Sequence, residues 1–502
     1  MKHVTPVFWI SIALCAALVI WGAVSPGQLQ GVTNTLTSAF STGFGWYYLI
    51  IVVFILGFCV YLIFSPYGRI KLGSDDAEPE FKLPTWFAML FSAGMGMGMV
   101  FWTTAEPISH AFVNSPEAET GSQQAIRESL QYSFFHWGIH AWAVYAIVAL
   151  ALAYFKFHRG YPGLISATLI PLLGEKSMRG LPGILIDALA VFATVLGVAS
   201  TLGFGTAQIN EGMAFLFNTP NTFTVQIIVL VVATVLFIIS AWSGISKGIK
   251  HMSNINMWLG FLLLITLFIV GPTLYILDMF TSTTGNYLSD FFHMSFRSAP
   301  LDDGTRGWID AWTIFYWAWW ISWSPFVGIF IARISKGRSI KEFMLGVLFV
   351  PSVVCFIFFS VFGVSALNLE QNGIAEISQY PMETATFAVL QEYPLGFVMS
   401  IVTLVVIAIF FITSADSATF VLGMLSTNGS IEPAGLVKIS WGVAMSFVAA
   451  VVMYYGGTQG LQNTLIIAAL PFSIVVLLMG GSFFKTVREE RRRQKEKEEK
   501  AT

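Results

Sequence analysis

Long apolar runs separated by short polar connections dominate this sequence. Each run is close to or longer than the roughly 20 residues that an α-helix needs to cross the hydrocarbon core of a bilayer. The runs lack the period-two alternation of a membrane-spanning strand, so helices are predicted throughout. The predicted spans cover residues 7–25, 46–66, 85–105, 129–157, 184–213, 223–243, 253–277, 309–332, 343–366, 394–426, 436–456 and 462–484. The predicted fold class is an all-α integral membrane protein with 12 transmembrane helices.

Lysine and arginine are distributed unevenly among the connections between these spans. If the N-terminus lies in the cytoplasm, all but three of the 26 Lys and Arg residues fall in cytoplasmic connections or in the C-terminal tail. The exceptions are Arg127, Arg297 and Arg306. Cytoplasmic connections are enriched in these residues, so both termini are predicted to be cytoplasmic, with the chain in the cell membrane. Removing the first run as a signal peptide would destroy this alternation, so it is retained as a span.

Composition narrows the classes of function. Apolar residues make up 56% of the 502 positions and charged residues 11%, too few to solvate the surface of a water-soluble globule. Lipid is the expected environment, and the net charge of −2 gives no reason to expect a nucleic-acid partner. Cys15, Cys59 and Cys355 lie within apolar runs without metal-ligand spacing and are interpreted as buried apolar residues.

Gly94, Gly96 and Gly98 lie close together at mid-membrane depth in the third span. A glycine weakens a helix by roughly 1 kcal/mol relative to alanine, and lipid cannot satisfy the backbone groups that unwinding would free. The segment must therefore line a cavity or pack very tightly. A close crossing of two helices is the alternative, and the glycines alone favour it slightly.

The eighth span carries a second candidate interruption, at Trp317–Phe326. Pro325 removes a backbone donor there, and Ser322 and Ser324 offer substitute partners. Spans 3 and 8 are five apart, as expected for two inverted repeats, spans 3–7 and 8–12, that each begin with a discontinuous helix. Unwound backbone at corresponding places predicts a binding site between the repeats.

This interpretation divides the chain into five parts. They are two N-terminal helices with a cytoplasmic loop (1–84), a first repeat (85–280), an outer interfacial helix (281–300), a second repeat (301–484) and a charged cytoplasmic tail (485–502). Packing of the outer segment against neighbouring spans is an equal alternative to an interfacial position.

Aromatic residues of spans 4 and 8 gather around the predicted interruption. They are Trp137, Trp142, Tyr145, Trp319, Trp320 and Trp323. An indole face attracts an organic cation by about 2 kcal/mol or more once water is excluded. No acid lies in 94–98 or 317–326, so a purely cationic ligand would lack a counter-ion and a methylated zwitterion is predicted. Its carboxylate would take freed backbone donors of the glycine run. For any single ring, ordinary helix packing is the alternative.

Three further ionisable side chains at membrane depth are candidates for a role. Asp416 is an acid within an apolar run, so it is either functional or holds neighbouring backbone. His136 and His140, at i and i+4, have the chemistry to bind metal or relay protons, but the sequence suggests no third ligand. Neither the polar stripe of a channel nor the convergent acid–base or metal constellation of an enzyme is visible.

Four segments resemble those of the betaine/choline/carnitine transporters. They are GMGMG at 94–98, FFHWGIHAWAVYAIV at 134–148, FYWAWWISWSPFVGIFIARISKGRSIKEF at 315–343 and FFITSADSATFVLG at 410–423. The resemblance covers nearly the whole chain and implies a leucine-transporter-type (LeuT-type) 5+5 repeat, alternating access and a homotrimer. It implies a substrate box of Trp137, Trp142, Tyr145 and Trp320, with Trp319 and Trp323 on the transport path.

The resemblance also implies one sodium site between spans 3 and 10. The matching positions are Ser92, Met95, Phe410, Thr413 and Ser414. Their backbone carbonyls and hydroxyls suit a hard cation. Sodium-independent exchangers of the family place a basic side chain from span 7 in this site, whereas residues 254–272 contain no Lys or Arg. Choline-carrying members have an acid at the position of Gly98, so the glycine agrees with a zwitterionic substrate.

We therefore expect a secondary transporter that imports glycine betaine, or a closely related trimethylammonium zwitterion, by sodium symport for osmoprotection. No cofactor is expected beyond sodium as the coupling ion. The alternative is sodium-independent or proton-coupled transport of carnitine, choline or other compatible solutes. The choice among betaine, carnitine, proline betaine and ectoine depends on the volume of the pocket and stays open.

Overall fold

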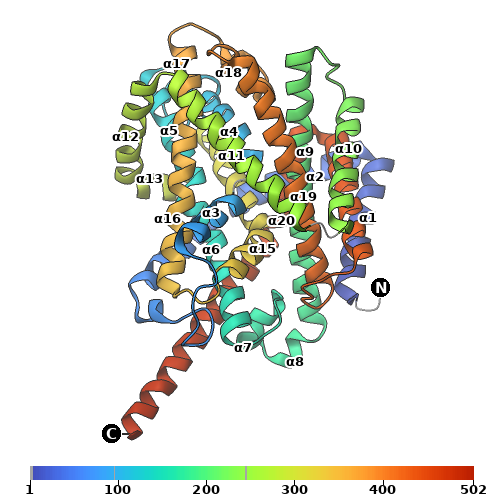
Figure 1. Cartoon of the computed structure of the whole chain (residues 1–502), viewed down its shortest axis with the longest axis vertical. Coiled ribbons are helices and arrows are strands. Elements are labelled where there is room, and N and C mark those ends of the chain that lie inside the picture. Colours follow the sequence, from blue (N-terminus) through green and yellow to red (C-terminus); the bar gives the residue numbers. More distant parts are fainter. Residues whose placement is uncertain (1–3, 95–96, 244–245, 502) are drawn as a thin grey trace.

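The computed structural model describes residues 4–94, 97–243 and 246–501, and helices make up nearly all of it (Figure 1). The one β-type pairing among these residues is an isolated antiparallel bridge between Lys71 and Ser339. The first helices are α1 (Pro6–Val24), α2 (Pro26–Phe64), α3 (Leu83–Gly94), α4 (Met97–Ile108), α5 (Gln123–Trp137), α6 (Ile139–Ala153), α7 (Ile170–Leu173), α8 (Glu175–Met178), α9 (Leu181–Phe217), α10 (Phe223–Ser243) and α11 (Ser246–Val270). The remainder are α12 (Thr273–Ser289), α13 (Phe291–Phe296), α14 (Asp303–Ile309), α15 (Phe315–Ile334), α16 (Ile340–Phe358), α17 (Val364–Gln371), α18 (Met382–Gln391), α19 (Gly396–Ser426) and α20 (Gly435–Ala501).

Ten helices within the described residues are long and apolar enough to cross a membrane. The predicted span 85–105 corresponds to α3 and α4, which have 12 residues each and are too short to be counted among them. α20 contains both of the last two predicted spans, with the non-helical residue Gly457 (φ +53°) between them. The prediction of a multi-pass helical membrane protein is confirmed, whereas the number of twelve spans stays a prediction.

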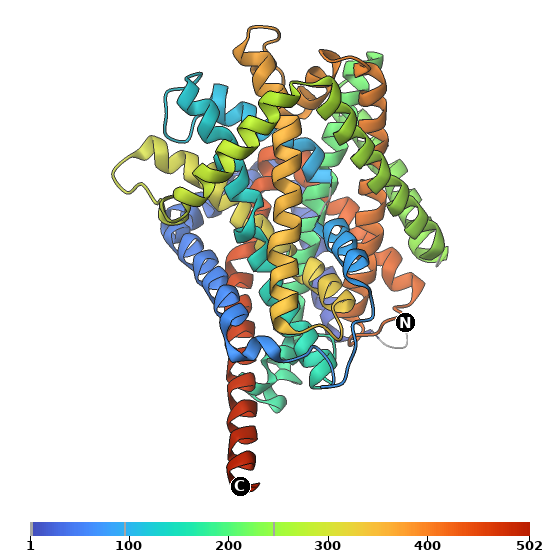
Figure 2. The ribbon, with the colours of Figure 1, turned by 60° about the vertical axis from the view of Figure 1, so that its left-hand side comes forward.

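The most deeply buried helices lie at the centre of the molecule. α15 packs against α6 and α9, and nearly all its side chains are buried. α10 and α11 lie on the outside of the bundle (Figures 1 and 2) and expose apolar side chains such as Val231, Ile239 and Phe261. Such an exposed apolar surface is suited to lipid.

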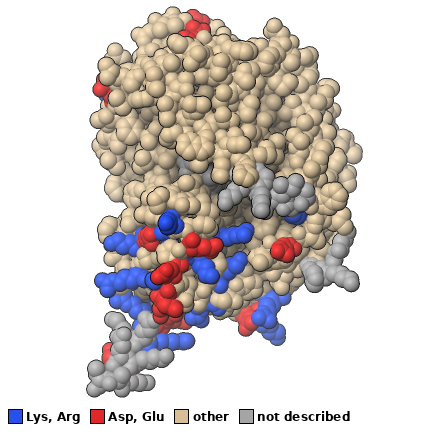
Figure 3. All heavy atoms as spheres, viewed as in Figure 1, with Lys and Arg blue, Asp and Glu red and all other residues tan. Residues whose placement is uncertain are grey.

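Charged side chains gather at the end of the molecule from which α20 emerges, and most of the remaining surface in that view is uncharged (Figure 3). The uncharged part is broad enough to form a lipid-facing belt. The three cysteines, Cys15, Cys59 and Cys355, are free and buried, which confirms their interpretation as apolar core residues.

The predicted interruption at Trp317–Phe326 is wrong, because α15 continues through this segment as one helix. Pro325 has no N–H to donate to the carbonyl of Ile321. The hydroxyl of Ser324 donates to that carbonyl instead, at 2.7 Å. The neighbouring serine thus replaces the missing backbone donor and the helix does not unwind. A departure from α-helical geometry does occur earlier, in a π-helical turn at Asp310–Ile314.

The predicted interruption in the third span falls between α3, which ends at Gly94, and α4, which begins at Met97. The two residues between them, Met95 and Gly96, lie outside the described residues. The discontinuity of this span therefore stays a prediction.

The fourth predicted span is divided at Gly138 into α5 and α6, which the sequence reasoning missed. Gly138 has φ −88° and ψ −149°, outside the α-helical region. A Cβ at this position would lie 2.5 Å from the Phe134 carbonyl oxygen and 3.1 Å from the ring of Phe356. Glycine avoids both contacts, and the division places Trp137 at the end of α5 and Trp142 in the first turn of α6.

The predicted outer segment, residues 281–300, is largely helical in α12 and α13. α12 begins at Thr273, inside the predicted span 253–277, because Pro272 lacks the N–H that would continue α11. The Gln131 side chain on α5 donates to the Asp290 carboxylate at 3.0 Å. The rings of Tyr287 and Phe356 are in contact, with their centroids 5.3 Å apart. The segment therefore packs against neighbouring helices, which was the alternative to an interfacial position.

Replacing Gly138 with alanine is expected to destabilise the protein, because the added Cβ would force the Phe134 carbonyl or the Phe356 ring to move. Thermal unfolding of the detergent-solubilised protein should show a Tm several degrees below that of the wild type. Gly57→Ala is the matched control, since a Cβ there meets nothing within 4 Å. If the two variants unfolded at the same temperature, the division of this span would not depend on glycine.

Candidate functional site

Four aromatic side chains from α5 and α15 form a buried group, here called the ring cluster. They are Trp137, Tyr316, Trp319 and Trp320. Trp319 and Trp320 are stacked with centroids 5.3 Å apart, and Tyr316 lies nearly parallel to both. Trp137 meets Trp320 edge-on at 5.0 Å. The structure thus brings together predicted rings from spans 4 and 8 and adds Tyr316, which was not predicted.

Trp142 and Tyr145 extend the ring cluster along α6. Trp142 contacts Tyr145 at 5.6 Å, and Tyr145 contacts Trp320 at 6.0 Å, both edge-on. All four predicted box residues are buried and belong to one continuous series of ring contacts. Their role in binding a solute stays a prediction.

Gly98 faces the ring cluster from α4. A Cβ at this position would lie 3.1 Å from Trp319 and 3.4 Å from Trp137. Glycine therefore lets α4 approach the rings closely, as small residues do between membrane helices. Gly94 is the last residue of α3 and Gly96 lies outside the described residues, so only Gly98 of the three can be placed against the rings.

Trp323 lies apart from the ring cluster. Its ring contacts Phe326 at 5.5 Å, and a Cβ at Gly197 on α9 would lie 2.8 Å from it. Trp323 is thus packed between α15 and α9. The indole nitrogens of Trp319 and Trp323 have no hydrogen-bond partner among the described residues.

A small hollow adjoins Trp319 between α4 and α9. It is lined by Gly98, Phe101, Trp102, Thr201, Phe204, Gln208 and Trp319. Gln208 is buried, and its Nε2 atom has no partner within the part of the chain that the structure describes. The hollow therefore combines aromatic surface with an unused polar donor beside the ring cluster.

Glu106 on α4 is a buried acid at the ring cluster that sequence reasoning missed. Its Oε2 accepts hydrogen bonds from Trp137 Nε1 at 3.0 Å and from the Tyr316 hydroxyl at 2.5 Å. Its Oε1 lies 2.7 Å from His136 Nδ1 and 3.3 Å from His110 Nε2. The predicted span 85–105 ends one residue before Glu106, whereas α4 continues to Ile108. A span extended to the end of α4 would have marked this acid as a functional candidate.

His136 and His140 do not share one ligand site. His140 Nε2 lies 2.9 Å from the Ser295 hydroxyl, whereas His136 contacts Glu106. The potential ligand atoms of Glu106, His110 and His136 lie within 4.8 Å of one another. Glu106 and His110 therefore place groups with metal-binding chemistry beside His136, which the sequence did not suggest.

The predicted sodium residues of span 10 lie on α19, which packs against α4. They are Phe410, Thr413 and Ser414. The Thr413 hydroxyl donates within its own helix and lies 3.3 Å from the Phe410 carbonyl oxygen. Ser92 belongs to α3, but its side chain and the whole of Met95 lie outside the described residues. Sodium ligation therefore stays a prediction.

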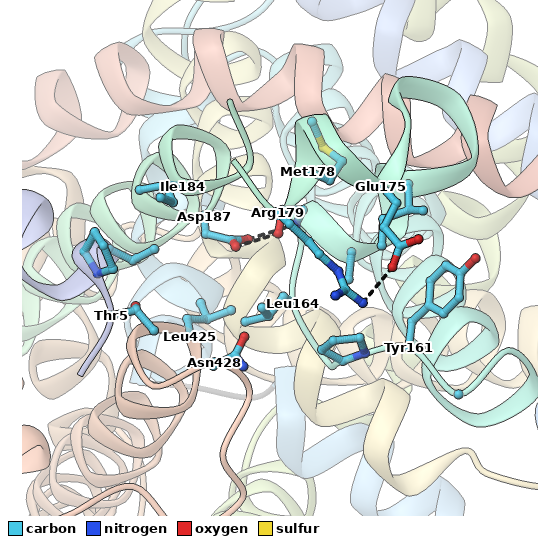
Figure 4. A pocket seen from close by; sticks show the side chains of 17 residues that line it. Thr5, Tyr161, Leu164, Glu175, Met178, Arg179, Ile184, Asp187, Leu425 and Asn428 are labelled. Atoms are coloured by element: carbon cyan, nitrogen blue, oxygen red, sulfur yellow. Dashed lines mark hydrogen bonds and ion pairs between the residues drawn. The ribbon is translucent and has the colours of Figure 1, made fainter. Parts of the chain in front are cut away.

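A cavity of about 570 Å³ lies elsewhere, where the N-terminal segment, α8, α9 and the end of α19 meet (Figure 4). Its buried acid, Asp187, accepts hydrogen bonds from the backbone and the hydroxyl of Ser166. Arg179 at its margin pairs with Glu175 at 2.6 Å. None of its described lining residues is a predicted substrate or sodium residue.

Comparison with known proteins gives matches along nearly the whole chain. The family model described as betaine/carnitine/choline family transporter matches residues 6–492. Glycine betaine transporter OpuD of Bacillus subtilis (strain 168) is 56% identical over 475 residues, which cover 95% of this chain and 93% of the relative. A probable glycine betaine transporter of Desulfitobacterium hafniense (strain Y51) is 40% identical over 481 residues, or 94% of this chain and 95% of that protein. Betaine/ectoine transporter LcoP of Corynebacterium glutamicum is 39% identical over 475 residues, or 93% of this chain and 75% of that protein.

The matched residues include α4, α5, α6 and α15, the helices that carry the ring cluster and the buried acid. Each of these relatives is named a transporter. The long apolar helices and the uncharged surface agree with that class of protein. The chain therefore belongs to the betaine/carnitine/choline family of transporters and is a multi-pass membrane transporter, not an enzyme.

Proposed function

We propose that this chain imports glycine betaine, or a closely related trimethylammonium zwitterion, by sodium symport for osmoprotection. The observation that carries the proposal is the buried series of ring contacts through Trp137, Trp320, Tyr145 and Trp142. Desolvated aromatic faces attract a cation that cannot donate hydrogen bonds. The relatives named glycine betaine transporters support the same substrate class.

The anionic end of such a solute needs donors near the rings. Trp319 and Gln208 both line the hollow beside the ring cluster. The indole nitrogen of Trp319 and the Nε2 atom of Gln208 are buried and have no partner among the described residues. They are the donors that we assign to the carboxylate, together with backbone groups of Gly94–Gly98. A zwitterion would then lie with its ammonium at the rings and its carboxylate towards α9.

The proposed membrane arrangement has twelve spans, cytoplasmic termini and a LeuT-type 5+5 repeat of spans 3–7 and 8–12, without an interruption in span 8. Gly457 divides α20 where the last two predicted spans meet, which supports the count. Charge concentrated at the end where α20 emerges supports a cytoplasmic C-terminus (Figure 3). The homotrimer and the surrounding lipid are part of the proposal through the resemblance to the family.

Sodium is the proposed coupling ion. Phe410, Thr413 and Ser414 lie on α19, whose packing against α4 brings span 10 to the span that carries Gly98. Neutral hydroxyls and carbonyls of this kind replace the water shell of a hard cation. The absence of Lys and Arg from residues 254–272 supports coupling to a mobile cation over a fixed basic side chain.

Uptake of labelled glycine betaine into proteoliposomes tests the proposed transport. We expect concentrative uptake with an inward sodium gradient and none when potassium replaces sodium on both sides, because the ion gradient supplies the driving force. Empty liposomes are the control. Uptake driven equally well by a proton gradient without sodium would contradict the ion assignment and favour the proton-coupled alternative.

Replacing Trp320 with alanine tests the ring cluster. Loss of a desolvated cation–π partner worth about 2 kcal/mol should raise the KM for betaine about thirtyfold. Initial uptake rates over a range of betaine concentrations give the KM. Trp258→Ala is the matched control, because Trp258 is an exposed residue of α11. Equal KM values for the two variants would remove the ring cluster from the substrate site.

A further inference from the structure

Four hydrogen-bonding groups surround the carboxylate of Glu106, which is fully buried. Two of them belong to ring-cluster residues, Trp137 and Tyr316, and both donate to Oε2. The other two are the ring nitrogens of His136 and His110 beside Oε1. The ring cluster is thus built around an acid that neither water nor lipid reaches.

These groups match an ionised carboxylate. An indole N–H can only donate, so Oε2 must accept from Trp137. His136 Nε2 lies 3.0 Å from the hydroxyl of Thr313, which donates to it when Nδ1 carries the proton that faces Glu106. An ionised carboxylate offers about four acceptor positions, and a donor is available for each of them. The hydrogen bonds can therefore stabilise the negative charge inside the bundle.

No Lys or Arg among the described residues forms an ion pair with Glu106. The ionisable side chains next to its carboxylate are those of His110 and His136. Arg297, which stacks on Trp308, is instead paired with Glu117 at 3.3 Å. Within the part of the chain that the structure describes, no Lys or Arg therefore neutralises the charge of Glu106 by direct pairing. In a medium of low dielectric constant, the field of such a charge reaches the neighbouring rings with little screening.

The same network holds both partners of the edge-on pair in the ring cluster. Trp137 donates directly to the carboxylate. Trp320 Nε1 donates to the backbone carbonyl of His136 at 3.0 Å, and the side chain of His136 contacts Glu106. Glu106 is therefore linked to both rings of the Trp137–Trp320 pair, whose centroids lie 5.0 Å apart, directly to Trp137 and through His136 to Trp320.

We infer that Glu106 is a positioning residue that gives the ring cluster its preference for a quaternary ammonium group. Its carboxylate accepts from Trp137 and orients that ring directly, and it holds the side chain of His136, whose backbone carbonyl accepts from Trp320. Its negative charge, transmitted through the indole N–H of Trp137, strengthens the attraction of the ring face for a cation. The inference rests on the proposed function, since it takes the ring cluster as the site of the trimethylammonium end.

The test compares glycine betaine with 3,3-dimethylbutanoate, in which carbon replaces the ammonium nitrogen. The two ligands share their shape and their carboxylate and differ in the positive charge. Tryptophan fluorescence of the purified full-length protein in sodium-containing detergent solution gives a Kd for each ligand. Near-UV circular dichroism and Tm report on the fold of each variant.

Glu106→Gln is expected to lower the preference for betaine over the carbon isostere about tenfold, as loss of one charged interaction does. The Kd of the isostere itself should change little. Glu106→Asp should recover part of the preference because it keeps the charge. Glu128→Gln is the matched control, since Glu128 is a buried acid of α5 whose partners, Gln124 and the Ala118 backbone, lie outside the ring cluster.

An unchanged preference in Glu106→Gln would overturn the inference. So would an equal loss of affinity for both ligands, because damage to the fold does not distinguish them. If Glu106→Gln does not fold, Tyr316→Phe removes one donor from the network: a lowered preference supports the inference and an unchanged preference overturns it. A wild-type protein that does not prefer betaine over the isostere would instead refute the proposed function.

Discussion

Backbone polar groups inside a bilayer must find their partners within the protein, and this constraint shapes the helices of the transporter. At Pro325 the carbonyl of Ile321 loses its helical donor, and the hydroxyl of Ser324 takes that place, so α15 continues. At Gly138 the helix divides where a Cβ would meet the Phe134 carbonyl. α15 continues because a side chain satisfies the free carbonyl, and the α5–α6 segment divides at a residue that has no Cβ to clash with its neighbours.

The same constraint applies to polar side chains at the centre of the bundle. Glu106 lies among aromatic rings, and its carboxylate is tolerated there because donors from α5 and α15 and the contact with His110 surround it. A buried acid of this kind costs several kcal/mol unless it is fully hydrogen-bonded. The hydrogen bonds that stabilise the acid also fix the rings, so charge stabilisation and ring orientation are one structural feature. The ring cluster is therefore held in place by hydrogen bonds to Glu106 as well as by apolar packing.

Much of the architecture could be predicted from the sequence because its signals are local. A run of apolar residues has the length of a membrane helix whatever surrounds it, and each of the ten long helices overlaps at least one predicted span, although α2 begins twenty residues before the span 46–66. The aromatic residues of spans 4 and 8 are also predictable, because Trp137, Trp142, Tyr145 and Trp320 are large aromatic residues within apolar spans and lie in segments that resemble the family. The resemblance to the transporter family rested on the same segments, and the family match over residues 6–492 agrees with it.

The sequence by itself determined which segments are helices, which rings are candidates for binding and which family the chain belongs to. Tertiary structure decided which polar groups pair in hydrogen bonds and which side chains pack together. His136 meets Glu106 across 30 positions and His140 meets Ser295 across 155. Phe356 of α16 closes the space at Gly138. Such partners are set by the packing of distant helices, whereas length and apolarity belong to each segment alone.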